Sequence, residues 1–119
     1  MSEICCMFQG KRKWEEAIAG LKHEEVLFND LRNYWLLYRC RKCGAWVLYE
    51  YEEQHYFTPD ENWDDAYCYD RYYPVESPEE AKALVETSHF RELHKERNHL
   101  EVFYKESTPE KKYFKWMTP

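Results

Sequence analysis

Helical spacing of hydrophobic residues marks the first element of the chain. Trp14, Ala17, Ile18 and Leu21 recur at intervals that place them on one side of a helix, and the pattern ends near Gly20. The sequence therefore predicts a short amphipathic helix in this region.

A start signal predicts a second helix. Ser77 supplies a capping hydroxyl, Pro78 is a proline at the first helical position, and Glu80 is a carboxylate that can reach back to the Ser77 amide. We expect this helix to continue through Ala81 and Val85, and then either to run on or to restart at the next serine.

Short runs of aromatic and β-branched residues predict strands. We expect strands at residues 34–39, 45–51, 66–73, 100–104 and 112–116. A turn at residues 40–44 would join the first two, and a turn around Pro109 would join the last two. Residues 54–65 have no periodicity and are expected to form a loop. Two alternatives stay open, because residues 26–38 also satisfy a helical stripe and Thr108 is a possible cap for a short helix.

The order of these elements predicts the fold class. We expect an α+β fold, a small single domain spanning residues 1–119 with a central antiparallel sheet and flanking helices, since no repeat or linker divides the chain. The longest apolar runs, such as Ala45 to Tyr49, are far shorter than the roughly 20 residues needed to cross a bilayer. The apolar run Ile4 to Phe8 precedes the basic cluster at 11–13, the reverse of a signal peptide, so a cytoplasmic protein without membrane association is expected.

Charge is distributed unevenly along the chain. The formal net charge is −6, but residues 50–80 contain eleven carboxylates and a single cation, Arg71, while residues 1–49 and 81–119 each hold six acids and eight bases. Tyrosines and Trp63 are interleaved with these carboxylates. A surface that is both acidic and aromatic is suited to binding a basic protein, and it disfavours direct binding to nucleic acid.

This stretch supplies the candidate interface. The carboxylates would provide electrostatic complementarity, and the rings would act as anchors. The predicted binding residues are Glu50, Glu52, Glu53, Asp60, Glu61, Trp63, Asp64, Asp65, Tyr67, Asp70, Tyr72 and Tyr73. The acids at 60–65 lack the ligand spacing and the central glycine of an EF-hand loop, so a calcium site is not expected.

Cys40, Cys43 and the glycine that follows them have the spacing of a zinc knuckle. One knuckle supplies half of a tetrahedral site, so a structural zinc ion would need further ligands, for which the candidates are Cys5, Cys6, Cys68 and His55. The other interpretation is a hairpin turn with reduced cysteines. An odd number of cysteines and the absence of a secretion signal do not favour a disulfide framework.

Motifs of catalysis are absent from the sequence. There is no metal-binding His-Glu-x-x-His, no nucleophile elbow and no phosphate-binding glycine loop. His89, His94 and His99 are spaced by five residues, which on a helix would place them on different sides. We therefore expect a protein that is not an enzyme, and a small hydrolase or transferase that uses histidines is the third reading.

Parts of the sequence resemble a known class of proteins. The run Tyr38 to Trp46 that contains the Cys-x-x-Cys, the acidic aromatic segment, and the stretch from Arg71 to Ala81 together are similar to small bacterial immunity proteins. These are cytoplasmic antidotes in polymorphic toxin systems, including contact-dependent growth inhibition. The resemblance implies a protein that binds its cognate toxin, often a nuclease, and blocks the active site.

The sequence thus predicts an immunity protein that neutralises a basic nuclease toxin domain by occlusion and needs no cofactor. We expect a monomer or a small homo-oligomer. The alternative is a zinc-knuckle adaptor or regulatory module that binds another protein through the Cys40 hairpin and depends on metal.

Overall fold

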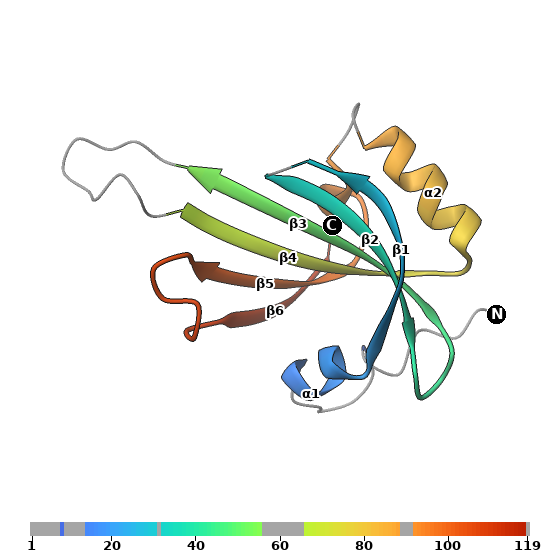
Figure 1. Ribbon diagram of the computed structural model, residues 1–119, viewed down its shortest axis with the longest axis horizontal. Coiled ribbons are helices and arrows are strands. Elements are labelled where there is room, and N and C mark those ends of the chain that lie inside the picture. The colour runs from blue at the N-terminus through green and yellow to red at the C-terminus, as the bar shows by residue number, and fades with distance from the viewer. Residues whose placement is uncertain (1–7, 9–13, 31, 56–65, 89–91, 119) are drawn as a thin grey trace.

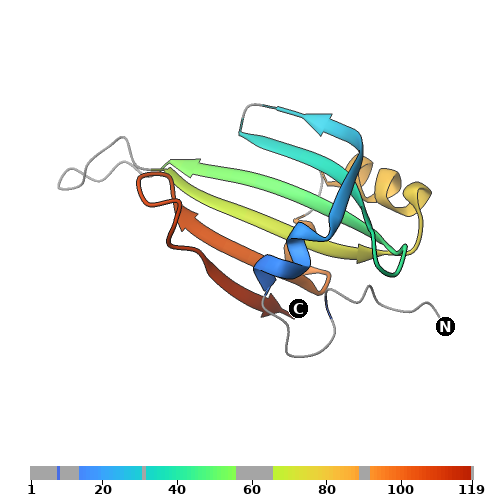
Figure 2. The same ribbon diagram turned by 60° about the horizontal axis from the view of Figure 1, so that its bottom comes forward.

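Six strands form one antiparallel sheet in the computed structural model of the protein, which describes residues 8, 14–30, 32–55, 66–88 and 92–118. Each strand pairs with the one before it in the chain (Figures 1 and 2). The strands are β1 (Leu21–Asn29), β2 (Asn33–Cys40), β3 (Trp46–His55), β4 (Ala66–Val75), β5 (His99–Lys105) and β6 (Tyr113–Met117). The predicted α+β fold with a central antiparallel sheet is confirmed.

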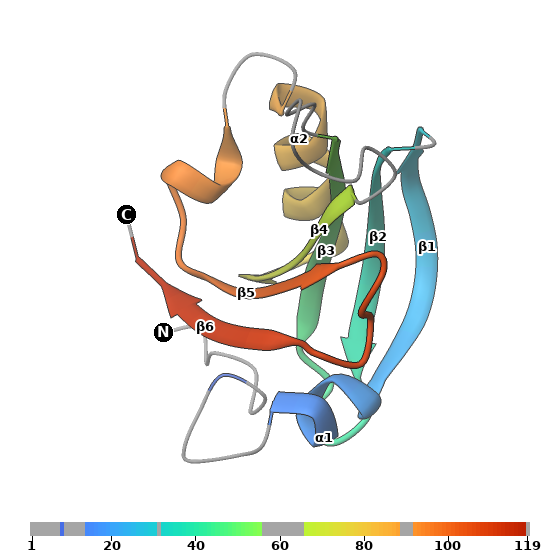
Figure 3. The ribbon, with the colours of Figure 1, turned by 90° about the vertical axis from the view of Figure 1, so that its left-hand side faces the viewer.

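Two helices lie on opposite sides of this sheet (Figure 3). The first, α1 (Trp14–Ala19), precedes β1, and the second, α2 (Pro78–Thr87), connects β4 to a short 3₁₀ helix, η2 (Leu93–Lys95), that leads into β5. Within the described residues, neither helix is both long and apolar enough to cross a membrane.

Alternation along the central strands gives the sheet two buried faces. On the α2 face, Leu48 of β3 and Tyr73 of β4 pack with Leu84 and Val85 of α2. On the α1 face, Tyr49 and Tyr72 pack in a second cluster with Ala17 of α1. Both faces are covered in the middle of the sheet, so side chains that point to either face are buried there.

Helix α2 starts where its sequence signal predicted, and one of the two expected capping hydrogen bonds is present. Ser77 Oγ accepts a hydrogen bond of 3.1 Å from the Glu80 amide, and Pro78 begins the helix. The expectation that the Ser77 amide donates a hydrogen bond to the Glu80 carboxylate is wrong. The Glu80 carboxylate instead accepts hydrogen bonds from the Glu76 amide at 3.4 Å and from Arg97 at 3.1 Å.

Strand β1 is the element that the sequence did not predict. Most of its residues are exposed, several are charged, and its pairing with β2 is interrupted by two register shifts. Because a bulged, charged edge strand lacks clean alternation, the usual strand signal is absent. The open helical alternative for 26–38 is excluded by β1 and β2.

The bounds of the predicted strands differ from the structure by one residue or more, and two differences are larger in consequence. Gln54 and His55 belong to β3 rather than to a loop, and residues 56–65 lie outside the described part of the chain. Helix α2 ends at Thr87, and η2 follows as a separate element. The C-terminal hairpin is confirmed as β5 and β6, with no helix at Thr108.

Candidate functional site

Arg71 lies at the centre of three carboxylates on the α2 face of the sheet. Glu50 of β3 and Glu101 of β5 stand directly opposite Arg71 of β4 in the strand register, and Glu52 follows two positions along β3. The guanidinium donates hydrogen bonds to Glu50 at 3.3 Å, to Glu52 at 2.7 Å and to Glu101 at 3.1 Å. We call these four residues the Arg71 cluster.

Contacts within the cluster favour the charged forms of Arg71 and Glu52 although both side chains are largely buried. Burial opposes the charge of Arg71, but the Glu50 and Glu52 carboxylates outweigh this effect and raise its pKa. Burial likewise opposes ionisation of Glu52, yet hydrogen bonds from Arg71 and a neighbouring glutamine keep the pKa of Glu52 below its ordinary value. Tyr73 and Asn33 also donate to Glu50, at 3.0 and 3.2 Å. Three carboxylates against one guanidinium leave an excess of negative charge.

A pocket opens beside this cluster, between β2, β3, the residue that follows α2, and η2 with Glu92. Its volume is about 320 Å³. The residues that line it are Arg32, Asn33, Trp35, Glu50, Glu52, Glu53, Ser88, Glu92, Leu93 and His94. We call it the acidic pocket, because four of its lining residues are glutamates and one is an arginine.

Two of the residues at η2 that line the acidic pocket, Glu92 and His94, are ionisable. Glu92 is exposed at its rim and forms an ion pair with Lys95. His94 is half-buried, and burial together with the positive charge of Arg71 lowers its pKa. A neutral imidazole among carboxylates adds no positive charge, so the pocket has the electrostatics of a site for a cation.

Four aromatic rings extend across the same face at the ends of β4, β5 and β6 away from α2. Tyr69, Phe103 and Tyr113 occupy facing positions on the three strands, with ring centroids 5.2 and 6.3 Å apart, and Tyr67 stacks on Phe103 at 5.7 Å. We call these four rings the aromatic ladder. The Arg71 guanidinium lies 5.0 Å from the Tyr69 ring centroid, so the ladder adjoins the Arg71 cluster.

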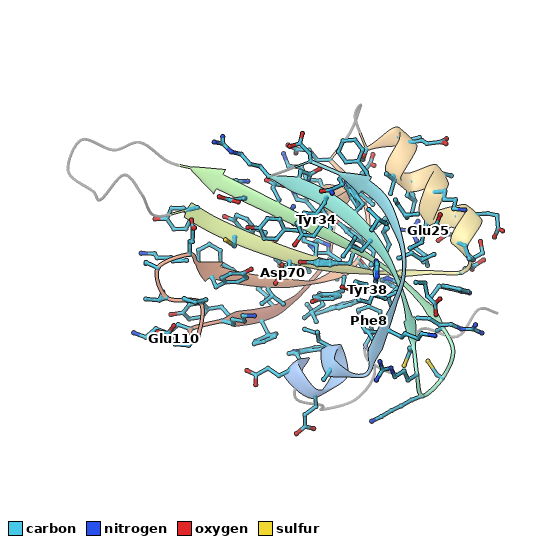
Figure 4. The ribbon with its side chains drawn as sticks, viewed as in Figure 1. Phe8, Glu25, Tyr34, Tyr38, Asp70 and Glu110 are labelled. Atoms are coloured by element: carbon cyan, nitrogen blue, oxygen red, sulfur yellow. The ribbon has the colours of Figure 1, made fainter. Side chains whose placement is uncertain are left out.

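The opposite, α1 face holds a second group of tyrosines around a buried carboxylate. Tyr49 donates a hydrogen bond of 2.5 Å to Asp70, and Tyr34 and Tyr38 stack against Tyr49. Figure 4 labels Tyr34, Tyr38 and Asp70 of this group. Burial raises the pKa of Asp70 above its ordinary value, although Tyr49 and Lys112 act in the other direction. Dense packing and hydrogen bonding indicate a structural role for this group.

The structure separates the predicted binding residues into three sets. Glu50, Asp70, Tyr72 and Tyr73 are buried, so the expectation that the acidic stretch forms one exposed face is wrong at these positions. The two carboxylates accept hydrogen bonds within the sheet, Glu50 from Arg71 and Asp70 from Tyr49.

The second set is half-buried and reaches the candidate site. Glu52 and Glu53 line the acidic pocket, although the Glu53 carboxylate also accepts a hydrogen bond from Tyr51, and Tyr67 belongs to the ladder. The third set lies outside the described residues and comprises Asp60, Glu61, Trp63, Asp64 and Asp65. Their role in binding stays a prediction.

Sequence reasoning did not select the residues that the fold adds to these sites. Glu92 and His94 reach the acidic pocket from η2, and Phe103 and Tyr113 reach the ladder from β5 and β6. Of the four rings of the ladder, only Tyr67 was predicted as a binding residue, and Tyr69 lies two positions along the same strand. The other two required the register of β4 with β5 and of β5 with β6, which a single sequence does not contain.

The Cys40 to Gly44 segment forms the predicted turn. The Cys40 amide donates to the Ala45 carbonyl and the Gly44 amide donates to the Cys40 carbonyl, both at 2.9 Å, and Gly44 has a φ of 75°. Only glycine adopts this conformation readily, which explains its place after Cys43. Cys40 is buried and Cys43 is exposed.

A metal centre finds no support in the described residues. These residues contain no group of three or more His, Cys, Asp or Glu side chains placed to hold an ion. Cys68 is buried and lies 3.4 Å from the Tyr51 hydroxyl. Cys5, Cys6 and the His55 side chain lie outside the described part, so a zinc ion at Cys40 and Cys43 stays a hypothesis.

Two histidines approach each other although the sequence placed them on different sides of a helix. The rings of His94 and His99 are 6.4 Å apart, because η2 ends before His99 and the chain enters β5. His99 is buried, and its Nδ1 lies 3.0 Å from the Arg97 carbonyl oxygen. His89 lies outside the described residues.

Among the residues that the structure describes, the acidic pocket and the aromatic ladder are two surface features of the α2 face that offer a binding chemistry. Comparison with known proteins assigns no relatives, because the chain matches no family model, no curated protein and no solved structure.

Proposed function

We propose that this chain is an immunity protein that binds and neutralises a basic toxin domain, and that the acidic pocket receives a cationic side chain of that toxin. The observation that carries the proposal is the convergence of Glu50, Glu52 and Glu92 on one pocket, whose lining holds four glutamates and one arginine, Arg32. A guanidinium or ammonium group is the chemical complement of such a site.

The pocket combines buried and accessible negative charge. The Glu50 side chain is almost fully buried and is held by Arg71, Tyr73 and Asn33. The Glu52 side chain is 25% exposed and the Glu92 side chain is 58% exposed, so both are open to a partner. Because Glu50 and Glu52 lie on β3, which is paired with β2 on one side and β4 on the other, little ordering would be needed upon binding.

Charge also supports the class of partner. The net charge of −6 and the eleven carboxylates in residues 50–80 would attract a basic protein over a distance. Such steering raises association rates toward about 10⁸ to 10⁹ M⁻¹s⁻¹ at low salt. A nuclease carries positive charge where its substrate phosphates bind, and an acidic inhibitor can occupy that place. The resemblance to immunity proteins points to the same partner.

Calorimetry tests this proposal directly. The full chain would be titrated with a catalytically inactive variant of the protein encoded beside its gene, at about 50 mM and about 300 mM salt. We expect one-to-one binding with a nanomolar dissociation constant that weakens at the higher salt. Absence of binding at both salt concentrations would contradict the proposal.

A second candidate function has one observation in its favour. The turn that holds Cys40 and Cys43 has the positive-φ glycine of a zinc knuckle, which keeps a metal-dependent adaptor in consideration. Zinc content in protein purified without added metal decides between the two. Cys43 is the residue to replace because it is exposed. If Cys43→Ser removes neither metal nor thermal stability, the adaptor function is ruled out.

A further inference from the structure

The outer end of the aromatic ladder borders a second depression. It has a volume of about 600 Å³ and lies at the turn between β5 and β6. Its lining residues are Phe103, Lys105, Ser107, Thr108, Lys111 and Tyr113. Figure 4 places this turn, marked by Glu110, at the end of the molecule away from Glu25 and α2.

One wall of this depression is aromatic and already ordered. Tyr113 is 65% exposed, an unusual state for a large ring, and it contacts Phe103, which stacks in turn on Tyr67 and Tyr69. Neighbouring strands hold these rings side by side. A planar ligand that stacks here would not have to pay for ordering the rings.

The other walls are cationic and polar. Lys105 and Lys111 contribute ammonium groups, and Lys105 Nζ lies 5.6 Å from the ring centroid of Tyr67, next to the ladder. Ser107 and Thr108 contribute hydroxyls. Glu106 and Glu110 belong to the same turn but do not line the depression. Its charge is thus opposite to that of the acidic pocket.

We propose that this depression binds a free nucleotide, with the base stacked on Phe103 and Tyr113 and the phosphate beside Lys105 and Lys111. Rings beside lysines match the two parts of a nucleotide, since every base has a face for stacking and the phosphate needs a cation. The hydroxyls of Ser107 and Thr108 suit the ribose. The volume of the depression is within the range of small-molecule sites, about 300 to 1,000 Å³.

The surroundings favour a single nucleotide over a nucleic-acid strand. A strand that continued along the ladder would next meet Glu101 and Glu52 of the Arg71 cluster, whose three carboxylates repel phosphates. This site therefore agrees with the expectation that the chain does not bind nucleic acid directly. The proposal is independent of the toxin-binding proposal and uses different residues.

Titration of the full chain with adenosine monophosphate, adenosine and inorganic phosphate tests the assignment. We expect adenosine monophosphate to bind with a dissociation constant on the order of 10 to 1,000 µM. Adenosine and phosphate should each bind more weakly, because each lacks one of the two contacts. Absence of adenosine monophosphate binding at millimolar concentration would overturn the proposal.

Variants locate the site. Tyr113→Ala should weaken binding about 5- to 150-fold, the range for loss of one stacking ring, and Lys111→Ala should weaken the binding of the monophosphate more than that of adenosine. Both residues are exposed, so the fold should be retained. Lys82→Ala on α2 is the control and should have no effect. Unchanged affinity in Tyr113→Ala, or tighter binding of a single-stranded oligonucleotide than of the monophosphate, would overturn the assignment.

Discussion

The Arg71 guanidinium lies 3.3 Å from the Glu50 carboxylate inside the sheet, where 3% of the arginine side chain and 8% of the glutamate side chain are exposed. Arg71 is the single cation of the acidic stretch, and its position opposite Glu50 in the register explains why it is there. A buried carboxylate needs a compensating charge. The same guanidinium also donates hydrogen bonds to Glu52 and Glu101. Glu50 and Glu52 in turn line the acidic pocket.

Arg71→Met should destabilise the protein by about 3 to 5 kcal/mol, because it leaves the Glu50 carboxylate buried without its cation. The free energy of unfolding in urea measures this effect. Adding Glu50→Gln to the same protein should recover part of the loss, since an amide carries no charge to compensate. If the double variant is no more stable than Arg71→Met alone, the buried charge is not the cause.

An exposed ion pair gives the matched control for this prediction. Lys82 Nζ lies 3.5 Å from Glu25 across α2 and β1, and both side chains are about half exposed. Lys82→Met should change the free energy of unfolding by less than about 1 kcal/mol.

Tyr49→Phe should destabilise the protein by about 1 to 3 kcal/mol, because it removes the 2.5 Å hydrogen bond to the buried Asp70 carboxylate. Urea denaturation measures the change. Tyr38→Phe, in the same tyrosine group, is the control, since no described contact engages its hydroxyl. Equal effects of the two substitutions would argue against a specific role of the Tyr49–Asp70 bond.

Asp70→Asn should change how stability depends on pH. Burial raises the pKa of Asp70 in the folded state, so the folded protein binds this proton more tightly than the unfolded chain. The stabilising contribution is present at low pH and is lost as the pH rises from the unfolded value, about 3.9, through the raised folded value. The difference in unfolding free energy between Asp70→Asn and the parent should therefore shift in favour of the variant across this window. A constant difference would contradict the assignment.

Partner binding should weaken as the pH falls, and His94 should be responsible. Burial and Arg71 lower its pKa from the ordinary 6.5, so His94 is neutral at pH 7 and becomes cationic only below its lowered pKa. A positive charge inside a pocket that receives a cation should reduce affinity roughly tenfold. Calorimetry against pH, with His94→Gln for comparison, measures this effect. The same pH dependence in both proteins would exclude His94 as its source.

Local signals predicted most of the fold. The capping serine and Pro78 located α2, and aromatic alternation located β2, β3 and β4, because each signal comes from neighbouring residues. Strand β1 has no such signal, since its charged residues face solvent on an irregular edge. The predicted bond between the Ser77 amide and the Glu80 carboxylate does not form, because Arg97, 17 positions away, donates to that carboxylate.

The candidate site was less accessible to sequence reasoning. Counting charge identified Glu50 and Glu52 as important, but their attachment to Arg71 and Glu101 depends on strand register. Tyr73 is buried and Tyr67 is partly exposed, although both are tyrosines of the same strand on the same face. A sequence shows which residues alternate, and the depth of each strand decides which of them a partner can touch.

The acidic pocket can be tested most directly by two charge reversals compared in one experiment. Glu92 lies at the pocket rim and Glu86 lies on α2 away from it, and both are exposed. The association rate with an inactive variant of the proposed toxin partner would be measured at low salt by stopped-flow fluorescence. We predict that Glu92→Lys slows association about tenfold or more while Glu86→Lys changes it by no more than about twofold. Equal rates for the two variants would show that the partner does not approach through the acidic pocket.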